Sequence, residues 1–135
     1  MPNARIVEFY ELSATRSVLD EIESDLTKVQ MVRFERNVNR LETHGWGLDG
    51  SFFDNVAGSK MGLREYRLTL DKVEYRVLFS EEAGGIFLML VGYKEQSGGI
   101  PASKISTAEN RLRVWRAAHP AKPLEKTAPD KKRKR

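Results

Sequence analysis

Two arginines, Arg67 and Arg76, are the residues whose type and spacing point most directly to chemistry. Each stands in a short segment in which apolar and polar residues alternate, 63–70 (LREYRLTL) and 74–80 (EYRVLFS), and this pattern predicts two β-strands. The link between the segments is so short that the strands must be antiparallel neighbours. A guanidinium group carries a fixed charge and a bidentate donor fork, so two of them on one sheet face would suit a phosphate.

The apolar pattern also predicts how the two strands pair. Side chains alternate between the two faces of a strand. The apolar residues of both segments therefore lie on one face of the sheet only if each pair of opposite residues has numbers with an odd sum. A two-residue turn at Asp71-Lys72 pairs Leu70 with Val73, and it places Arg67 directly opposite Arg76 on the face away from the helices. Asp-Lys is not a preferred hairpin turn, so a longer loop would make the arginine pair diagonal.

Like charges directly opposite each other destabilise a sheet by a few tenths to about 1 kcal/mol. One interpretation is that an anion binds between the arginines and offsets this cost. The other is that Glu65 and Glu74, which share their face, neutralise them as an exposed ladder of charges. The sequence pattern leaves both interpretations open.

Four more residues near these strands are candidates for the same surface. Tyr93 and Lys94 end the third predicted strand and lead into the glycine-rich segment 96–99. Lys60 precedes the strands, and Arg64 falls on their apolar side, so we expect its head group to leave at the sheet edge. Taken alone, Lys94 and Tyr93 are better explained as a surface lysine and a tyrosine at the edge of the core.

Other chemistries are disfavoured by the composition. The absence of cysteine excludes a disulfide framework, a thiolate nucleophile and a Cys-based zinc site, and the two histidines, His44 and His119, form no recognisable metal site. No glycine-rich phosphate loop follows a strand. We therefore expect no metal ion and no cofactor.

Periodicity and turn signals predict the elements that position these residues. We expect a strand, two helices, a weak strand or connector, three strong strands and a last helix over residues 5–10, 16–25, 28–43, 52–57, 63–70, 74–80, 86–94 and 102–117. The third strong strand is apolar on both faces, so it should lie inside the sheet. The predicted fold class is α+β: an N-terminal strand and helical hairpin, an antiparallel three- to four-stranded meander and a C-terminal helix, with the helices on one face of the sheet.

Length and charge predict one domain, residues 1–118, followed by a basic, disordered tail, residues 119–135. The net charge of +4 suits an acidic partner such as nucleic acid, but the last five residues are all basic, so the folded part is close to neutral. No apolar run is long enough to span a membrane, and the N-terminal residues lack a secretory stretch, so we expect a cytoplasmic protein. The interpretation as a nuclear basic protein would depend on the basic tail alone.

Residues through the meander and the last helix form an ordered set that resembles the RelE/HigB superfamily of bacterial toxins, especially its phage-associated HigB-like branch. Its pattern is an apolar-Glu-apolar-Arg strand, a Tyr-Arg-Val-Leu-Phe strand, an apolar strand ending in aromatic-Lys, and a helix with Pro, Ile, Ala and Arg. Here these positions are held by Glu65, Arg67, Tyr75, Arg76, Tyr93, Lys94, Pro101, Ile105, Ala108 and Arg111. The resemblance covers residues 5–116.

The resemblance implies a RelE-like fold and the toxin of a type II toxin–antitoxin system, which inhibits translation by cutting mRNA, often on the ribosome. It also implies an antitoxin, expected to be a small helix-turn-helix protein, that covers the basic face. Arg76 falls at the position that contacts the scissile phosphate, and Arg67 and Lys94 fall at further basic positions of the catalytic site. The C-terminal tyrosine of RelE has no match, because Ile100 stands in that neighbourhood, and the histidines of some HigB proteins are also missing.

The expected reaction uses the 2′-OH of the RNA as the nucleophile and needs no metal ion. We expect Arg76 and Arg67 to stabilise the charge on the phosphorane-like transition state, and Lys94 to act as the base. The residues expected to contact RNA are Lys60, Arg64 and Tyr93. The alternative function is a non-catalytic module on the same fold that binds RNA or a protein partner.

Overall fold

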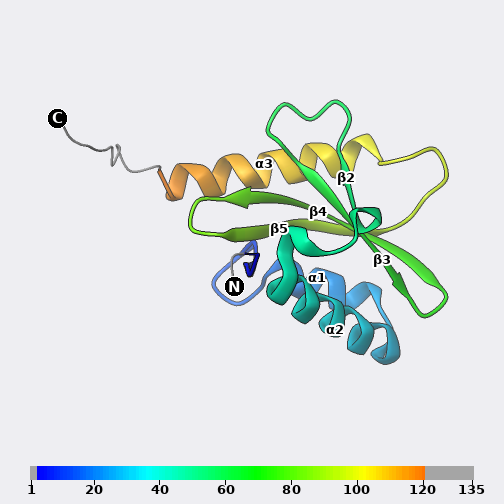
Figure 1. The fold of residues 1–135 in the computed structure, drawn as a ribbon. Helices are drawn as coiled ribbons and strands as arrows, with labels where there is room; N and C mark the ends of the chain where they lie inside the picture. The colour runs from blue at the N-terminus through cyan, green and yellow to red at the C-terminus, as the bar shows by residue number, and fades with distance from the viewer. Residues whose placement is uncertain (1–2, 121–135) are drawn as a thin grey trace.

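A five-stranded sheet forms the centre of the computed structural model, which describes residues 3–120 (Figure 1). The strands are β1 (Ile6–Phe9), β2 (Phe53–Asn55), β3 (Arg64–Leu70), β4 (Val73–Glu82) and β5 (Ile86–Lys94), and the α-helices are α1 (Val18–Asp25), α2 (Lys28–His44) and α3 (Ala102–Ala118). The strand order is β1-β5-β4-β3-β2, with β1 parallel to β5 and every other pair antiparallel. The predicted α+β fold is confirmed, and β5 lies inside the sheet as expected.

Helices cover both faces of this sheet, with α3 on one side of the strands and α1 and α2 on the other (Figure 1). On the α1/α2 face, side chains such as Tyr66, Tyr75 and Phe79 pack against both helices. On the α3 face, Leu78 and Leu88 pack with the helix. The sheet is therefore the middle layer of three.

This arrangement corrects the prediction that all helices pack on one face of the sheet. The face that carries Arg76 also carries Leu78 two residues later, and β5 contributes Leu88 and Leu90 to it. An apolar surface of this extent has to be covered, and α3 covers it with Ala108 and Leu112, which are fully buried. The arginines consequently share their face with a helix, which the sequence interpretation did not anticipate.

Both N-terminal helices begin at a capping box. Ser17 accepts a hydrogen bond from a backbone N–H of the first turn of α1, and Asp20 accepts one from the Ser17 backbone. Thr27 and Gln30 make the same reciprocal pair at the start of α2. Because each capping box satisfies backbone N–H groups at a helix start, two separate helices form with almost no linker.

The register of β3 and β4 is the predicted one. Leu70 pairs with Val73, and Arg67 stands directly opposite Arg76. The two-residue turn is made possible by Asp71, which adopts a positive φ of 51°. Aspartate tolerates this left-handed conformation better than most residues, so the turn closes although Asp-Lys is not a favoured pair. The predicted tail, residues 119–135, lies almost entirely outside the described residues.

Candidate functional site

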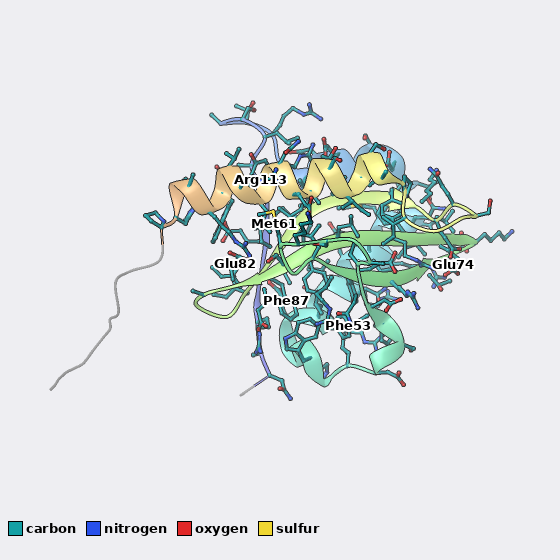
Figure 2. All side chains as sticks on the ribbon, turned by 90° about the horizontal axis from the view of Figure 1, so that it is seen from above. Phe53, Met61, Glu74, Glu82, Phe87 and Arg113 are labelled. Carbon is teal, nitrogen blue, oxygen red and sulfur yellow. The ribbon has the colours of Figure 1, made fainter. Side chains whose placement is uncertain are left out.

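The arginine pair lies on the α3 face of the sheet, beside the loop after β5 that leads back to α3. The two arginines behave differently toward solvent. The Arg76 side chain is 10% exposed, whereas the Arg67 side chain is 41% exposed. Figure 2 labels the two ends of β4: Glu74 marks the end near this loop, and Glu82 lies toward the C-terminal end of α3.

A buried carboxylate, Glu65, holds the inner side of both guanidinium groups. Arg67 Nε donates to Glu65 Oε1 at 3.1 Å, and Arg76 Nε lies 4.0 Å from Glu65 Oε2. Tyr93, opposite Arg76 in the register, donates its hydroxyl to Glu65 Oε2 at 2.9 Å. Arg76 Nη1 also donates to the Tyr75 backbone carbonyl at 3.1 Å. These contacts fix the position of both arginines relative to the sheet.

More exposed carboxylates contact the outer nitrogens of the arginines. Arg67 Nη2 donates to Asp54 Oδ2 at 2.6 Å, Arg76 Nη2 donates to Glu95 Oε2 at 2.9 Å, and Arg76 Nη1 lies 3.5 Å from Glu74 Oε1. The side chains of Asp54, Glu74 and Glu95 are about half exposed, whereas Glu65 is 7% exposed. The outer nitrogens, which would bind a phosphate, are therefore occupied by groups that can rotate into solvent.

The contacts of the two arginines agree with the charge-ladder interpretation, and binding of an anion stays a prediction. Glu65 and Glu74 do neutralise the arginines, as the charge-ladder interpretation expected, and Asp54 and Glu95 add to this. Glu65 is buried rather than exposed, however, so it acts as a fixed support. With four carboxylates around two guanidinium groups, an anion can bind only if the exposed carboxylates move away.

The environment shifts two pKa values at this site. Burial, followed by the hydrogen bond to Glu65, raises the pKa of the Tyr93 hydroxyl well above its ordinary value. The hydrogen bond from Arg67 to Glu65 raises the pKa of that guanidinium group. At neutral pH Tyr93 is therefore a proton donor only, and Arg67 keeps its charge.

A cleft of about 630 Å³ opens over the arginine pair. It combines charged side chains with an apolar wall that includes Ile100 and Ile105 and with the segment after β5. The residues that line it are Asp54, Asn55, Ala57, Glu65, Arg67, Arg76, Tyr93, Glu95, Gln96, Ser97, Gly98, Gly99, Ile100 and Ile105. Its volume falls in the range of small-molecule and nucleotide sites.

A second cleft, of about 410 Å³, adjoins the first, because Arg67 and Arg76 line both. It reaches from the arginine pair to α2, where Asn37 and Arg40 line it, and to Phe52 before β2. The strand β2 ends its pairing with β3 at Tyr66, so the edge of β3 from Arg67 onward is left uncovered by a neighbouring strand. The two clefts together form a hollow around this edge.

Lys94 is not brought together with the arginine pair. It pairs with Tyr75, whose ring packs against Phe34 of α2 and whose hydroxyl donates to Asp25. Directly paired residues of antiparallel strands point to the same side, so Lys94 belongs to the α1/α2 face, whereas Tyr93 faces Arg76. The predicted role of Lys94 as the base therefore has no support from this geometry.

Lys60 and Arg64 lie outside the first cleft. Lys60 is exposed in the turn between β2 and β3, and its backbone N–H donates to Glu109 of α3. Arg64 lies on the α1/α2 face, where its guanidinium carbon is 4.6 Å from the centre of the Trp46 ring. Its Nε is buried and lacks a hydrogen-bond partner within residues 3–120. Of the six predicted site residues, the cleft thus unites Arg67, Arg76 and Tyr93.

Sequence reasoning identified Glu65 and Glu74 but missed the other two carboxylates of the site, Asp54 and Glu95. Asp54 falls in the weak connector 52–57 and Glu95 directly after the third strong strand, and neither position has a periodic pattern that would relate it to Arg67 or Arg76. Arg40 was also missed, although its spacing from Arg33 and Arg36 places all three on one side of α2. That spacing was a usable signal.

Residues 3–120 contain neither a metal-binding cluster nor a membrane-spanning helix. Within residues 3–120, none of the groups of His, Asp and Glu is arranged to hold a metal ion. Over the same residues, each helix is too short or too polar to cross a bilayer.

Comparison with known proteins identifies the family. None of the curated proteins compared matches the chain. The family model described as "Phage derived protein Gp49-like (DUF891)" matches residues 20–113, a span that contains most of α1, all of α2 and β2 to β5, and most of α3. The arginine pair and its supporting Glu65 all lie within that span. The chain therefore belongs to the Gp49-like family of phage-derived proteins, which is a toxin-like group of the RelE/HigB type.

Proposed function

We propose that this chain is the toxin of a type II toxin–antitoxin system, in the phage-associated HigB-like branch, and that it cleaves mRNA without a metal ion. The observation that carries the proposal is the arginine pair. Arg67 and Arg76 stand opposite each other, both are supported by the buried Glu65, and their outer nitrogens face the cleft. Two fixed donor forks at one point suit the charge of a phosphodiester.

RNA carries its own nucleophile, because the 2′-OH lies next to the scissile phosphate. In-line attack forms the bond from O2′ to phosphorus and breaks the bond from phosphorus to O5′, which leaves a 2′,3′-cyclic phosphate and a 5′-OH end. The phosphate first displaces Glu95 from Arg76 and Asp54 from Arg67. The two arginines then stabilise the added negative charge of the transition state, and Arg76 is the main contact because it is held more rigidly.

Two protons must be transferred in this reaction. The raised pKa of Tyr93 prevents it from accepting a proton at neutral pH, and Lys94 lies on the other face of the sheet. A carboxylate is then the remaining base near the arginines. We assign this role to Glu95, because it contacts the outer nitrogen of Arg76 and is half exposed, whereas both oxygens of Glu65 already accept hydrogen bonds. Released by the phosphate, Glu95 stays beside it and takes the proton of the 2′-OH, and a water molecule gives the departing O5′ the proton that completes the 5′-OH end.

The partners follow from the same proposal. The substrate is mRNA, presented on the ribosome in the cytoplasm of a bacterial cell. The antitoxin is a small helix-turn-helix protein that covers the clefts and keeps the arginine pair from RNA. Lys60, Arg64 and Tyr93 remain predictions as RNA-contacting residues, and of these three Tyr93 lines the first cleft.

The test is controlled expression in a bacterial host, with mapping of transcript ends. Wild-type protein should arrest growth and leave 2′,3′-cyclic phosphate and 5′-OH ends, and purified protein should cleave in EDTA. Arg76→Ala should lower cleavage by about 100- to 1,000-fold, the usual cost of removing one donor from a transition state. A strict need for added Mg²⁺ would contradict the mechanism.

A matched control separates this effect from a general loss of charge or folding. Arg113 is exposed on α3 and donates only to Asn110, so Arg113→Ala removes the same charge far from the clefts. This variant should be as toxic as the wild type. Circular dichroism should show that Arg76→Ala is folded, and an Arg76→Ala protein that is folded and fully toxic would remove Arg76 from the site.

A second candidate function is a non-catalytic module that binds RNA or a protein partner. The observation in its favour is that each arginine of the pair already has carboxylate partners, so the site is satisfied without a ligand. Harmless high-level expression, with intact transcripts, would favour this candidate over the enzyme.

A further inference from the structure

Three arginines on α2 form an exposed basic stripe that the reaction does not use. Arg33, Arg36 and Arg40 are spaced three and four residues apart, so they share one side of the helix over an axial length of about 10 Å. All three are exposed. Among residues 3–120 none of the carboxylates pairs with them, in contrast to Arg67 and Arg76. Their charge is therefore available to a partner.

The acidic residues of α2 lie on a different side of the helix. Glu42 accepts the backbone N–H of Val7 in β1, at the opposite edge of the sheet from β2. Glu35 lies seven residues before Glu42, which is about two helical turns, and so on the same side of the helix. The helix thus separates its charges, with the basic stripe away from the acidic side.

The basic stripe is continuous with the candidate site. Arg40 lines the second cleft with Arg67 and Arg76, and its guanidinium carbon lies 5.6 Å from the centre of the Phe52 ring in the same cleft. Arg33 and Arg36 border a further hollow of about 260 Å³ with Val29 and Val32, two of the exposed apolar residues. Cations contact the phosphates of an RNA strand and aromatic rings stack on its bases, so the three arginines together with Phe52 offer both kinds of contact.

We propose that Arg33, Arg36 and Arg40 bind the phosphates of the single-stranded RNA that extends from the scissile phosphate held by Arg67 and Arg76. This inference rests on the proposed function and adds to it a path for the substrate: around the open edge of β3, through the second cleft and along α2. The stripe supplies affinity and orientation, because phosphate contacts position a strand without reading its sequence.

The test measures binding of a single-stranded RNA of roughly 16 nucleotides, made non-cleavable by 2′-O-methyl groups, as a function of salt. The variant is the triple Arg33→Gln, Arg36→Gln and Arg40→Gln. Each phosphate contact to a single strand contributes about 0.7 to the slope of log K against log salt, so the slope should fall by about 2. Between about 50 and 200 mM salt, the wild type should then lose about 20-fold more affinity than the variant loses.

The matched control removes three positive charges elsewhere. Arg16, Lys28 and Arg113 are exposed and lie outside both clefts and the stripe. The triple Arg16→Gln, Lys28→Gln and Arg113→Gln should keep the slope of the wild type. Equal slopes for both triple variants would overturn the proposal.

Two further outcomes identify what else the stripe would bind. If the first triple variant binds free RNA like the wild type but cleaves poorly on ribosomes, the stripe contacts ribosomal RNA and the proposal is overturned. If the first triple variant binds RNA like the wild type but no longer binds its antitoxin, the stripe is a protein interface and the proposal is likewise overturned. Failure of the wild type to cleave or bind any RNA would instead remove the proposed function, and this inference with it.

Discussion

Replacing Glu95 with glutamine should strengthen RNA binding, because Glu95 competes with the phosphate for Arg76. In the free protein, Arg76 Nη2 donates to Glu95 Oε2 at 2.9 Å. Glutamine is nearly isosteric but uncharged, so the variant keeps the shape of the loop after β5 and removes the competing charge. The Glu95→Gln variant should therefore bind RNA more tightly than the wild type does.

The magnitude follows from the exposure of the pair. Glu95 is 51% exposed, and exposed ion pairs of this kind contribute about 0.2–1 kcal/mol. A phosphate that no longer has to break the pair should bind more tightly by the same amount, which is about 1.4- to 5-fold. The upper part of this range is expected, because Arg76 itself is largely buried.

The assay is equilibrium binding of the non-cleavable RNA, so that the role of Glu95 as base does not interfere. Glu35→Gln is the matched control, because it makes the same change in net charge at an exposed position of α2 outside both clefts. Glu95→Gln should bind more tightly than this control, and it should cleave ordinary RNA about 100-fold or more slowly if Glu95 is the base. Equal or weaker binding than Glu35→Gln would refute the competition between Glu95 and the phosphate.

Two further predictions concern stability. Burial raises the pKa of Glu82, but hydrogen bonds from Arg116 and Ser80 outweigh burial, so the pKa is lowered overall. The ionised carboxylate therefore stabilises the folded state at a pH above its ordinary pKa. This stabilisation is lost as the pH falls through the lowered pKa. In urea titrations, Glu82→Gln should therefore be less stable than the wild type at pH 7, and a difference that did not shrink below about pH 4 would contradict this. Gly92→Ala should destabilise the protein by about 1–3 kcal/mol in the same assay. The reason is steric, because a Cβ at this position would lie 2.7 Å from Tyr75 Oη and 2.8 Å from Ile22 of α1. An unchanged unfolding midpoint would show that these side chains can move apart.

The register of the central hairpin could be predicted from sequence because local rules determine it. Alternating apolar residues set which faces meet, and the two-residue turn then leaves only one pairing, so Arg67 opposite Arg76 required no tertiary information. The capping boxes at Ser17 and Thr27 were predictable for the same reason, since their partners lie three residues away.

The carboxylates around the arginines could not be predicted in this way. Asp54 reaches Arg67 from a strand of three residues, and Glu95 reaches Arg76 from an irregular loop, so their positions depend on tertiary packing rather than on a repeating pattern.

The packing of α3 was missed for a related reason. The apolar residues of β5 on both faces were recognised as a sign of an interior strand, but the same observation requires a cover on each face, and α3 supplies the second one.

The parallel pairing of β1 with β5 has a consequence for how the chain folds. It joins Ile6 to Ile86, whereas the β3–β4 hairpin joins Leu70 to Val73. The entropic cost of closing a loop rises with its length, and non-local pairing slows folding, so the hairpin can form early while β1 must wait until β5 has been synthesised. Docking of the N-terminal strand is therefore a late step in maturation. Substitutions within Ile6–Phe9 should therefore mainly speed unfolding, whereas substitutions in the hairpin turn should slow folding.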